Sequence, residues 1–213
     1  MAIGGITPSY GFLKHVLHSL SIPVFALIRP RSGNFTYSDA EFDIMKQDII
    51  LSKKLGVAGI VSGVLQQDNS IDIIRTKKLI DLASPLPFTF HRAFDWTPQP
   101  IQAIKQLIAI GAKRVLTSGQ SAKAELGIEL LNKLQIAAHN KIIILPGSGI
   151  NSDNVTLFQQ SGFKEIHASA TTSQSINAPK VSMNSASFLS DSNIYYSDLN
   201  KIKSILKHIS DED

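Results

Sequence analysis

The sequence contains no cysteine, and this absence excludes several kinds of chemistry. Without cysteine the chain can form no disulfide, no thiolate metal site and no thiolate nucleophile. A chain without disulfides fits the reducing cytoplasm, and we expect a cytoplasmic location. The only sulfur atoms belong to Met1, Met45 and Met183, which are scattered along the chain.

Long apolar runs and blocks of charge are missing as well. No run of eighteen apolar residues occurs, so we expect no membrane span and no membrane partner. The first residues lack a charged segment followed by an apolar one, so we expect no signal peptide. The formal net charge of +4 is small and the lysines are spread out, so we expect no nucleic-acid partner. The patterns G-x-S-x-G, H-E-x-x-H and Walker A are absent too, so no motif of this kind names a reaction.

The 213 residues that are present predict one α/β domain over 1–213. Short apolar stretches alternate with helical patterns, and their centres recur about every 25–35 residues, the length of one βα unit. Parallel strands with right-handed connections follow from this order. The fold class we predict is a TIM-type (β/α) barrel that is incomplete, with about six parallel strands. These strands are expected over 22–28, 57–61, 88–91, 114–117, 141–145 and 164–168.

The ends of the helices carry recognisable signals. Ser38 with Glu41 three residues later forms a capping box that predicts a helix start. Gly56, Gly111 and Gly162 each fall between a predicted helix and the next strand, where a left-handed C-cap belongs. After residue 168 the pattern stops, and we expect a long loop over 170–193 and a final helix over 198–209.

The stretch P-F-T-F-H-R-A-F-D-W-T-P, residues 87–98, concentrates the polar chemistry. It opens as a strand and is predicted to end in a helix start, with Thr97 as N-cap and a proline next. A period of two places His91 on the inner face of the sheet, with Arg92 and Asp95 in the following loop. His91 could act as a general base oriented by Asp95. The alternative is a buried histidine satisfied by a neighbour, beside a solvated Arg92.

Polar or glycine-rich residues follow every predicted strand, and in a barrel these positions share one rim. The motif P-G-S-G-I-N, with a helix expected from residue 151 or 152, resembles a phosphate-binding loop. Guanidinium groups across the rim favour an anion. His91 and His167 are the only candidates for a metal site at this rim. The ligand-binding residues we predict are Arg29, Arg31, Arg92, Ser118, Gly147, Ser148, Gly149, His167 and Ser169.

Several long motifs give the chain a family resemblance. The sequence resembles the CutC family at T-F-H-R-A-F-D, I-R-P-R-S-G-N-F, V-L-T-S-G-Q, L-P-G-S-G-I-N and H-A-S-A, which occur in the family's order. The resemblance implies a TIM-type barrel, a cytoplasmic protein, a homodimer and an association with copper homeostasis. Copper is therefore a possible cofactor, although no cysteine ligand is available, and otherwise the cofactor is unknown.

The chain departs from the family at its start. Family members usually have a strand, a helix and a second strand before the G-G-x-T-P loop, and this chain begins in that loop. We therefore expect an open parallel sheet, covered by a partner subunit or by residues 170–193. A longer gene product that supplies the missing unit is the alternative.

Two functions remain open on the sequence alone. The first is a copper-homeostasis family protein that binds a small anionic molecule at the strand rim. The alternative is a TIM-barrel enzyme that acts on a phosphorylated or carboxylated small molecule and has no role in copper handling. A purely structural role is a third possibility.

Overall fold

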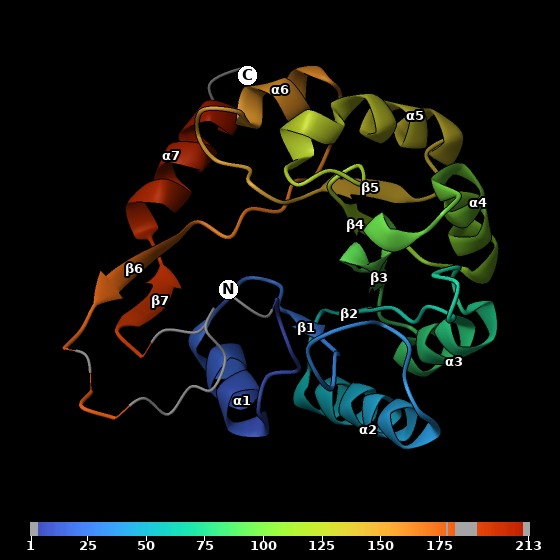
Figure 1. The fold of residues 1–213 in the computed structure, drawn as a ribbon, viewed down its shortest axis with the longest axis horizontal. Helices are drawn as coiled ribbons and strands as arrows, with labels where there is room; N and C mark the ends of the chain where they lie inside the picture. The colour runs from blue at the N-terminus through green and yellow to red at the C-terminus, as the bar shows by residue number, and fades with distance from the viewer. Residues whose placement is uncertain (1–3, 178, 182–190, 211–213) are drawn as a thin grey trace.

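The computed structural model describes residues 4–177, 179–181 and 191–210. Its centre is one curved sheet of five parallel strands in the order β1-β2-β3-β4-β5 (Figure 1). The α/β barrel type expected from the sequence is confirmed, and the barrel is not closed. The strands are β1 (Phe25–Leu27), β2 (Gly59–Ser62), β3 (Phe88–Phe90), β4 (Arg114–Thr117) and β5 (Ile143–Pro146).

The helices form an incomplete ring around the outer face of this sheet (Figure 1). Each of the first four packs against the next along the chain, and the sixth packs against the seventh. Among the described residues, no helix is both long and apolar enough to cross a lipid bilayer. The helices are α1 (Tyr10–Ser19), α2 (Asp39–Leu55), α3 (Ile73–Ala83), α4 (Pro100–Ile110), α5 (Ile128–Ala138), α6 (Val155–Gln160) and α7 (Leu199–Ser210), with 3₁₀ turns η1 (Arg92–Trp96) and η2 (Ala124–Gly127).

The predicted capping signals position two of the longer helices. Ser38 caps α2, and the Glu41 side chain accepts a hydrogen bond from the Ser38 backbone N–H, which completes the capping box. Gly56 and Gly111 end α2 and α4 with φ of 91° and 92°, a left-handed conformation that glycine adopts without steric cost. Gly162, with φ of 79°, lies one residue beyond the C-cap of α6. These signals confirm the helix-to-strand order.

Two helix starts differ from the prediction, because side chains make local hydrogen bonds that compete with the helix. Thr97 closes η1, and its hydroxyl donates to the Phe94 carbonyl at 2.8 Å, so α4 begins only at Pro100. After the glycine loop, the Asn151 side chain accepts from the Asp153 N–H at 2.8 Å, and α6 begins only at Val155. The expected helix start at residue 151 or 152 is therefore wrong.

The sixth predicted strand is reduced to a single bridge. Residues 164–168 meet β5 only at Gly147 and His167, where the His167 N–H donates to the Pro146 carbonyl at 2.8 Å. The sheet thus has five strands where about six were expected. In the part of the chain that the structure describes, no strand pairs with the outer edge of β1 or with the outer side of residues 164–168.

The segment expected to be a long loop over 170–193 has regular structure at both ends. Strand β6 (Thr171–Ser175) pairs antiparallel with β7 (Asn193–Ser197) in a separate two-stranded ribbon beside the open side of the barrel (Figure 1). Residues 178 and 182–190 of this segment lie outside the described residues. The final helix, expected over 198–209, is α7.

Candidate functional site

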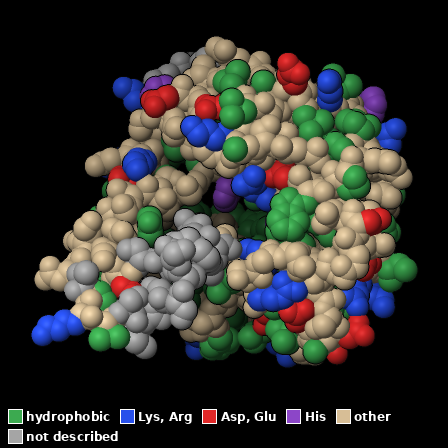
Figure 2. Space-filling model, viewed as in Figure 1, with side chains coloured by type: hydrophobic (Ala, Val, Ile, Leu, Met, Phe, Trp, Pro, Cys, Tyr) green, Lys and Arg blue, Asp and Glu red, His purple; other side chains and the backbone are tan. Residues whose placement is uncertain are grey.

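A cavity of about 770 Å³ lies inside the open barrel. Figure 2 shows it as a hollow near the centre of this face, bordered by basic, histidine and hydrophobic side chains. Alternate residues of each strand point into it, because side chains alternate between the two faces of a strand. The inward side chains include Leu27 of β1, Val61 of β2, Thr89 of β3, Leu116 of β4 and Leu145 of β5.

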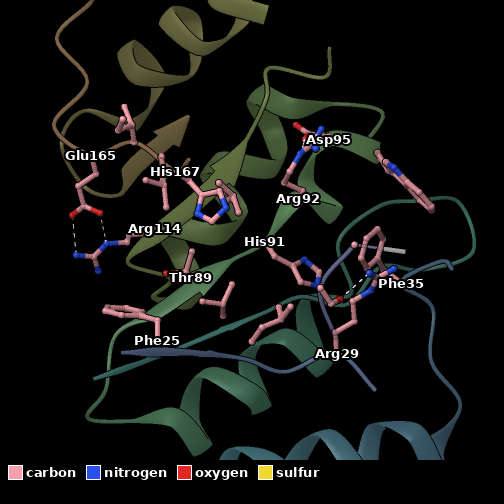
Figure 3. A pocket seen from close by; sticks show the side chains of 18 of the residues that line it. Phe25, Arg29, Phe35, Thr89, His91, Arg92, Asp95, Arg114, Glu165 and His167 are labelled. Carbon is pink, nitrogen blue, oxygen red and sulfur yellow. Dashed lines mark hydrogen bonds and ion pairs between the residues drawn. The ribbon is translucent and has the colours of Figure 1, made fainter. Parts of the chain in front are cut away.

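His91 follows β3 on this inner face, as the period of two predicted (Figure 3). The residue is 5% exposed, and its ring lies 4.8 Å from the Phe35 ring, centroid to centroid. Nδ1 accepts the Ala93 backbone N–H at 3.3 Å, so a neutral ring carries its proton on Nε2. Nε2 is buried and has no hydrogen-bond partner among the described residues. Burial, and then the positive charge of Arg29, lower the pKa of His91 to about 3.

Arg29 is buried at the end of β1, beside His91. Its Nη1 and Nη2 donate to the carbonyls of Gly5 and Gly33 at 3.0 and 2.8 Å, and its guanidinium lies 4.9 Å above the Phe35 ring. Gly4 has φ of 72°, and a Cβ there would lie 2.8 Å from Nη1 of Arg29. The glycine pair near the start of the chain therefore lets the backbone wrap closely around this guanidinium.

Asp95 does not orient His91. Its side chain is 7% exposed, and its carboxylate accepts hydrogen bonds from Arg92 Nε at 2.8 Å and from the backbone and hydroxyl of Ser118, both at 3.0 Å. Thr117 and Gln120 donate to the same carboxylate. Asp95 thus fastens η1 to the loop after β4 and holds Arg92 in place.

Arg92 is the more accessible guanidinium of the rim, with its side chain 43% exposed. Its Nη2 donates to Ser118 Oγ at 2.9 Å, and its Nη1 makes no hydrogen bond within the described part of the chain. His167 lines the same cavity from residues 164–168. Although His167 is exposed as a residue, the protein atoms around its ring, and then the charge of Arg92, lower its pKa.

An ion pair that sequence reasoning missed forms the floor of the cavity. Arg114 donates through Nε and Nη2 to the two carboxylate oxygens of Glu165, at 2.7 and 2.9 Å, and its guanidinium lies 5.4 Å from the centre of the Phe25 ring (Figure 3). The period of two could have found both residues, because Arg114 and Glu165 stand two positions before the inward Leu116 and His167. No comparable signal points to Phe35, which comes from a loop, or to Trp96 at the end of η1.

Five of the predicted site residues line the cavity together, namely Arg29, His91, Arg92, Asp95 and His167. Ser118 supports this group by its bonds to Asp95 and Arg92. The other five do not line it. Gly147 lies directly behind it, since a Cβ there would lie 2.6 Å from Leu116. Arg31 pairs with Glu41, the Ser148 hydroxyl donates to the Ala122 carbonyl, Gly149 lies against Lys123, and Ser169 is exposed.

The residues around the cavity do not fit a copper ion. Cu(I) favours thiolate and thioether ligands, and the chain has no cysteine. Met45 is fully buried in the core face of α2, while Met1 and Met183 lie outside the described residues. His91 uses Nδ1 to accept a backbone N–H. Among the described residues, no group of three histidine or carboxylate side chains could hold a metal ion.

Comparison with known proteins gives one consistent result. The family model described as "CutC family" matches residues 1–172. A CutC protein of Klebsiella pneumoniae is 48% identical over 167 residues, which cover 78% of this chain and 67% of the relative. A CutC protein of Vibrio vulnificus is 43% identical over 177 residues, 82% of this chain and 71% of the relative. The chain therefore spans about two thirds of the length of these relatives.

Comparison with solved structures gives the same family and the same fold. A crystal structure from Streptococcus agalactiae that carries the name copper homeostasis protein CutC has a TM-score of 0.74 and 37% identity, covering 78% of this chain and 83% of that one. The aldolase QR15 has a TM-score of 0.59 at 12% identity, over 74% and 73% of the two chains. The second likeness shows the barrel fold alone.

Proposed function

This chain belongs to the CutC family, and we propose that its open barrel binds a small organic anion at the carboxyl ends of the strands, between Arg92, Arg29 and His91. The observation that carries the proposal is the buried Nε2–H of His91, which has no acceptor among the described residues. An unpaired buried donor costs free energy, and an oxygen atom of a bound anion would pair with it.

The charge around the cavity supports an anion as the ligand. The charged side chains that line it are three guanidinium groups and two carboxylates, so one positive charge is in excess. Burial chiefly, and after it the charges of Arg29 and Arg92, lower the pKa values of His91 and His167, respectively. A positive potential that repels protons attracts an anion by the same physics.

The geometry supports binding better than acid–base catalysis. A general base works best with a pKa near the working pH, and the pKa of His91 is about 3. Its Nδ1 lone pair is already engaged with the Ala93 N–H. His91 is therefore suited to donate a hydrogen bond to a ligand rather than to take a proton from one.

The cytoplasmic location and the homodimer predicted from the sequence belong to the same proposal. Copper homeostasis, the role named for the S. agalactiae relative, would have to rest on something other than the cavity residues, because these do not fit the metal. Cell fractionation tests the location, and light scattering coupled to size-exclusion chromatography tests the dimer.

The test of the anion site uses Trp96, the single tryptophan of the chain, which lines the cavity. We expect small carboxylates or phosphates to change its fluorescence saturably and to raise the melting temperature. Arg92→Gln should weaken binding at least about tenfold, the loss of a charge-assisted hydrogen bond. Lys105→Gln removes the same charge from an exposed position of α4 and should have no effect.

Two results would overturn the proposal. One is the absence of saturable binding for every carboxylate and phosphate tested. The other is binding that Arg92→Gln and Lys105→Gln weaken equally, since this would indicate general charge attraction.

A further inference from the structure

Resting on the proposed anion site, we infer that the body of the ligand is apolar. The class that fits is a carboxylate with an aromatic or branched aliphatic body of about the size of phenylacetate. A sugar phosphate does not fit. Four features of the cavity carry this inference: its exposed apolar wall, the scarcity of polar partners between rim and floor, its neutral floor and its aromatic mouth.

The wall of the cavity is apolar and only partly covered. Leu27, Val61, Leu116 and Leu145 point inward and are half-buried, whereas their outward neighbours along each strand are buried against the helices. The inner face of the sheet is thus more exposed than the outer face. Covering such apolar surface is favourable in proportion to its area, so a ligand that brings apolar atoms gains affinity here.

Between the rim and the Arg114–Glu165 pair on the floor, few polar groups could bind hydroxyl groups of a ligand. Thr89 is the one hydroxyl residue among the described residues that line the cavity, and it is 2% exposed. Hydroxyl groups of a sugar that lay against this apolar part of the wall would lack partners, and each buried unpaired polar group costs free energy. The wall therefore selects against polyhydroxylated bodies.

The floor offers no net charge for a second anionic group. Arg114 and Glu165 neutralise each other through two parallel hydrogen bonds. The excess positive charge lies at the rim, with Arg29 and Arg92. A ligand that carries its negative charge at one end and an apolar group at the other matches this gradient.

The mouth of the cavity supplies aromatic surface next to the anion site. The Phe35 and Trp96 rings meet edge to face, with centroids 4.9 Å apart, and Trp96 is 49% exposed. Phe35 also packs against His91, so the same ring borders the polar and the apolar parts of the cavity. The volume of about 770 Å³ lies in the range of small-molecule sites.

The experiment titrates the full chain by Trp96 fluorescence, with melting temperature as a second readout. Phenylacetate and 4-methylpentanoate are the apolar probes, and acetate, glycerol 3-phosphate and glucose 6-phosphate are the polar ones. We expect phenylacetate to bind ~10- to 100-fold more tightly than acetate, because it buries an additional ring. Phenylacetamide, its neutral analogue, should bind at least about tenfold more weakly than phenylacetate.

A wall variant separates apolar contact from charge. Leu116→Gln should weaken phenylacetate binding at least about fivefold and leave acetate binding unchanged. Leu126→Gln is the matched control, because Leu126 is 70% exposed on η2, outside the cavity. If Leu116→Gln does not fold, Val61→Thr places a hydroxyl in the same wall with little change of shape, and the same selective loss is expected.

The outcomes distinguish this inference from the proposed function. If acetate or the phosphates bind through Arg92 and phenylacetate binds no more tightly, the anion site stands and the apolar body is wrong. If phenylacetate and phenylacetamide bind equally, or if no probe binds, the anion site itself fails and this inference fails with it.

Discussion

Acidification should destabilise this protein through His91 in a pH window that the structure defines. In an unfolded chain the pKa of a histidine is ~6.5, and in the folded protein burial lowers the pKa of His91 to about 3. Between these two values the unfolded chain binds a proton that the folded protein does not. The contribution of His91 to stability is therefore full above pH ~6.5, falls as the pH falls towards 3, and is constant below that.

The size of the effect follows from the width of this window. Each pH unit inside it changes the free energy of unfolding by ~1.4 kcal/mol. At pH 5 the loss from His91 alone is about 2 kcal/mol, and at pH 4 roughly 3 kcal/mol. For a chain of this length, a loss of 2 kcal/mol lowers the melting temperature by about 4–8 °C.

The assay compares urea unfolding of the wild type and of His91→Asn between pH 7 and pH 4. Asparagine retains an acceptor for the Ala93 N–H and cannot take up a proton in this range, so the variant is less stable at pH 7 but loses less stability on acidification. The difference between the two curves removes the contributions of the carboxylates and of His167. His18→Asn, at an exposed position of α1, is the control and should follow the wild type.

Parallel curves for the wild type and His91→Asn would refute the reasoning. They would mean that His91 takes up its proton equally readily in the folded and unfolded protein. In that case the ring is not held neutral in the cavity, and its Nε2–H is not the donor on which the proposed anion site depends.

Three further predictions concern the surroundings of the cavity. Asp95→Asn should lower the free energy of unfolding, measured by urea denaturation, by ~3 kcal/mol, because a buried carboxylate with several donors is lost. The control Asp43→Asn, at an exposed position, should change it by less than ~0.5 kcal/mol, and equal losses would contradict the role of Asp95. A double-mutant cycle of Arg114→Gln and Glu165→Gln should give a coupling free energy of ~1 kcal/mol in protein stability, since both side chains are partly exposed. Purely additive losses would show that the pair contributes nothing to stability. Cu(I) affinity, measured against a competing chelator, should be no better than that of an exposed imidazole pair, and a tight stoichiometric complex would prove this wrong.

Local signals made much of the fold predictable from the sequence. The Ser38 capping box and the glycine C-caps depend on residues within a few positions of one another, so the sequence contains all of the information. The inner face of β3 followed from alternation, because Phe88 and Phe90 need cover from helices and Thr89 and His91 therefore face inward.

The remaining features depend on partners that are distant in the sequence or on competing local bonds. Arg114 and Glu165 are 51 residues apart, and only the folded sheet brings them together. Proximity along the chain predicts that Asp95 orients His91, yet its donors are Arg92 and residues of β4 and the loop after it. A helix is expected at 151 or 152, but the turn made by the Asn151 side chain delays the start of α6 to Val155.

The Asp95 carboxylate also has a consequence for how this barrel can diversify. Barrel proteins acquire new ligands chiefly by varying the lengths of the loops after their strands. Here one side chain joins η1, after β3, to the loop after β4, so an insertion in either segment would pull Asp95 from its donors and displace Arg92. These two loops can change only together, whereas the loop after β5 contributes no bond to Asp95 in the described chain. The loop after β5 is in turn bonded to the segment after β4 through Ser148, so laboratory evolution of this scaffold should find length changes after β3, β4 and β5 coupled.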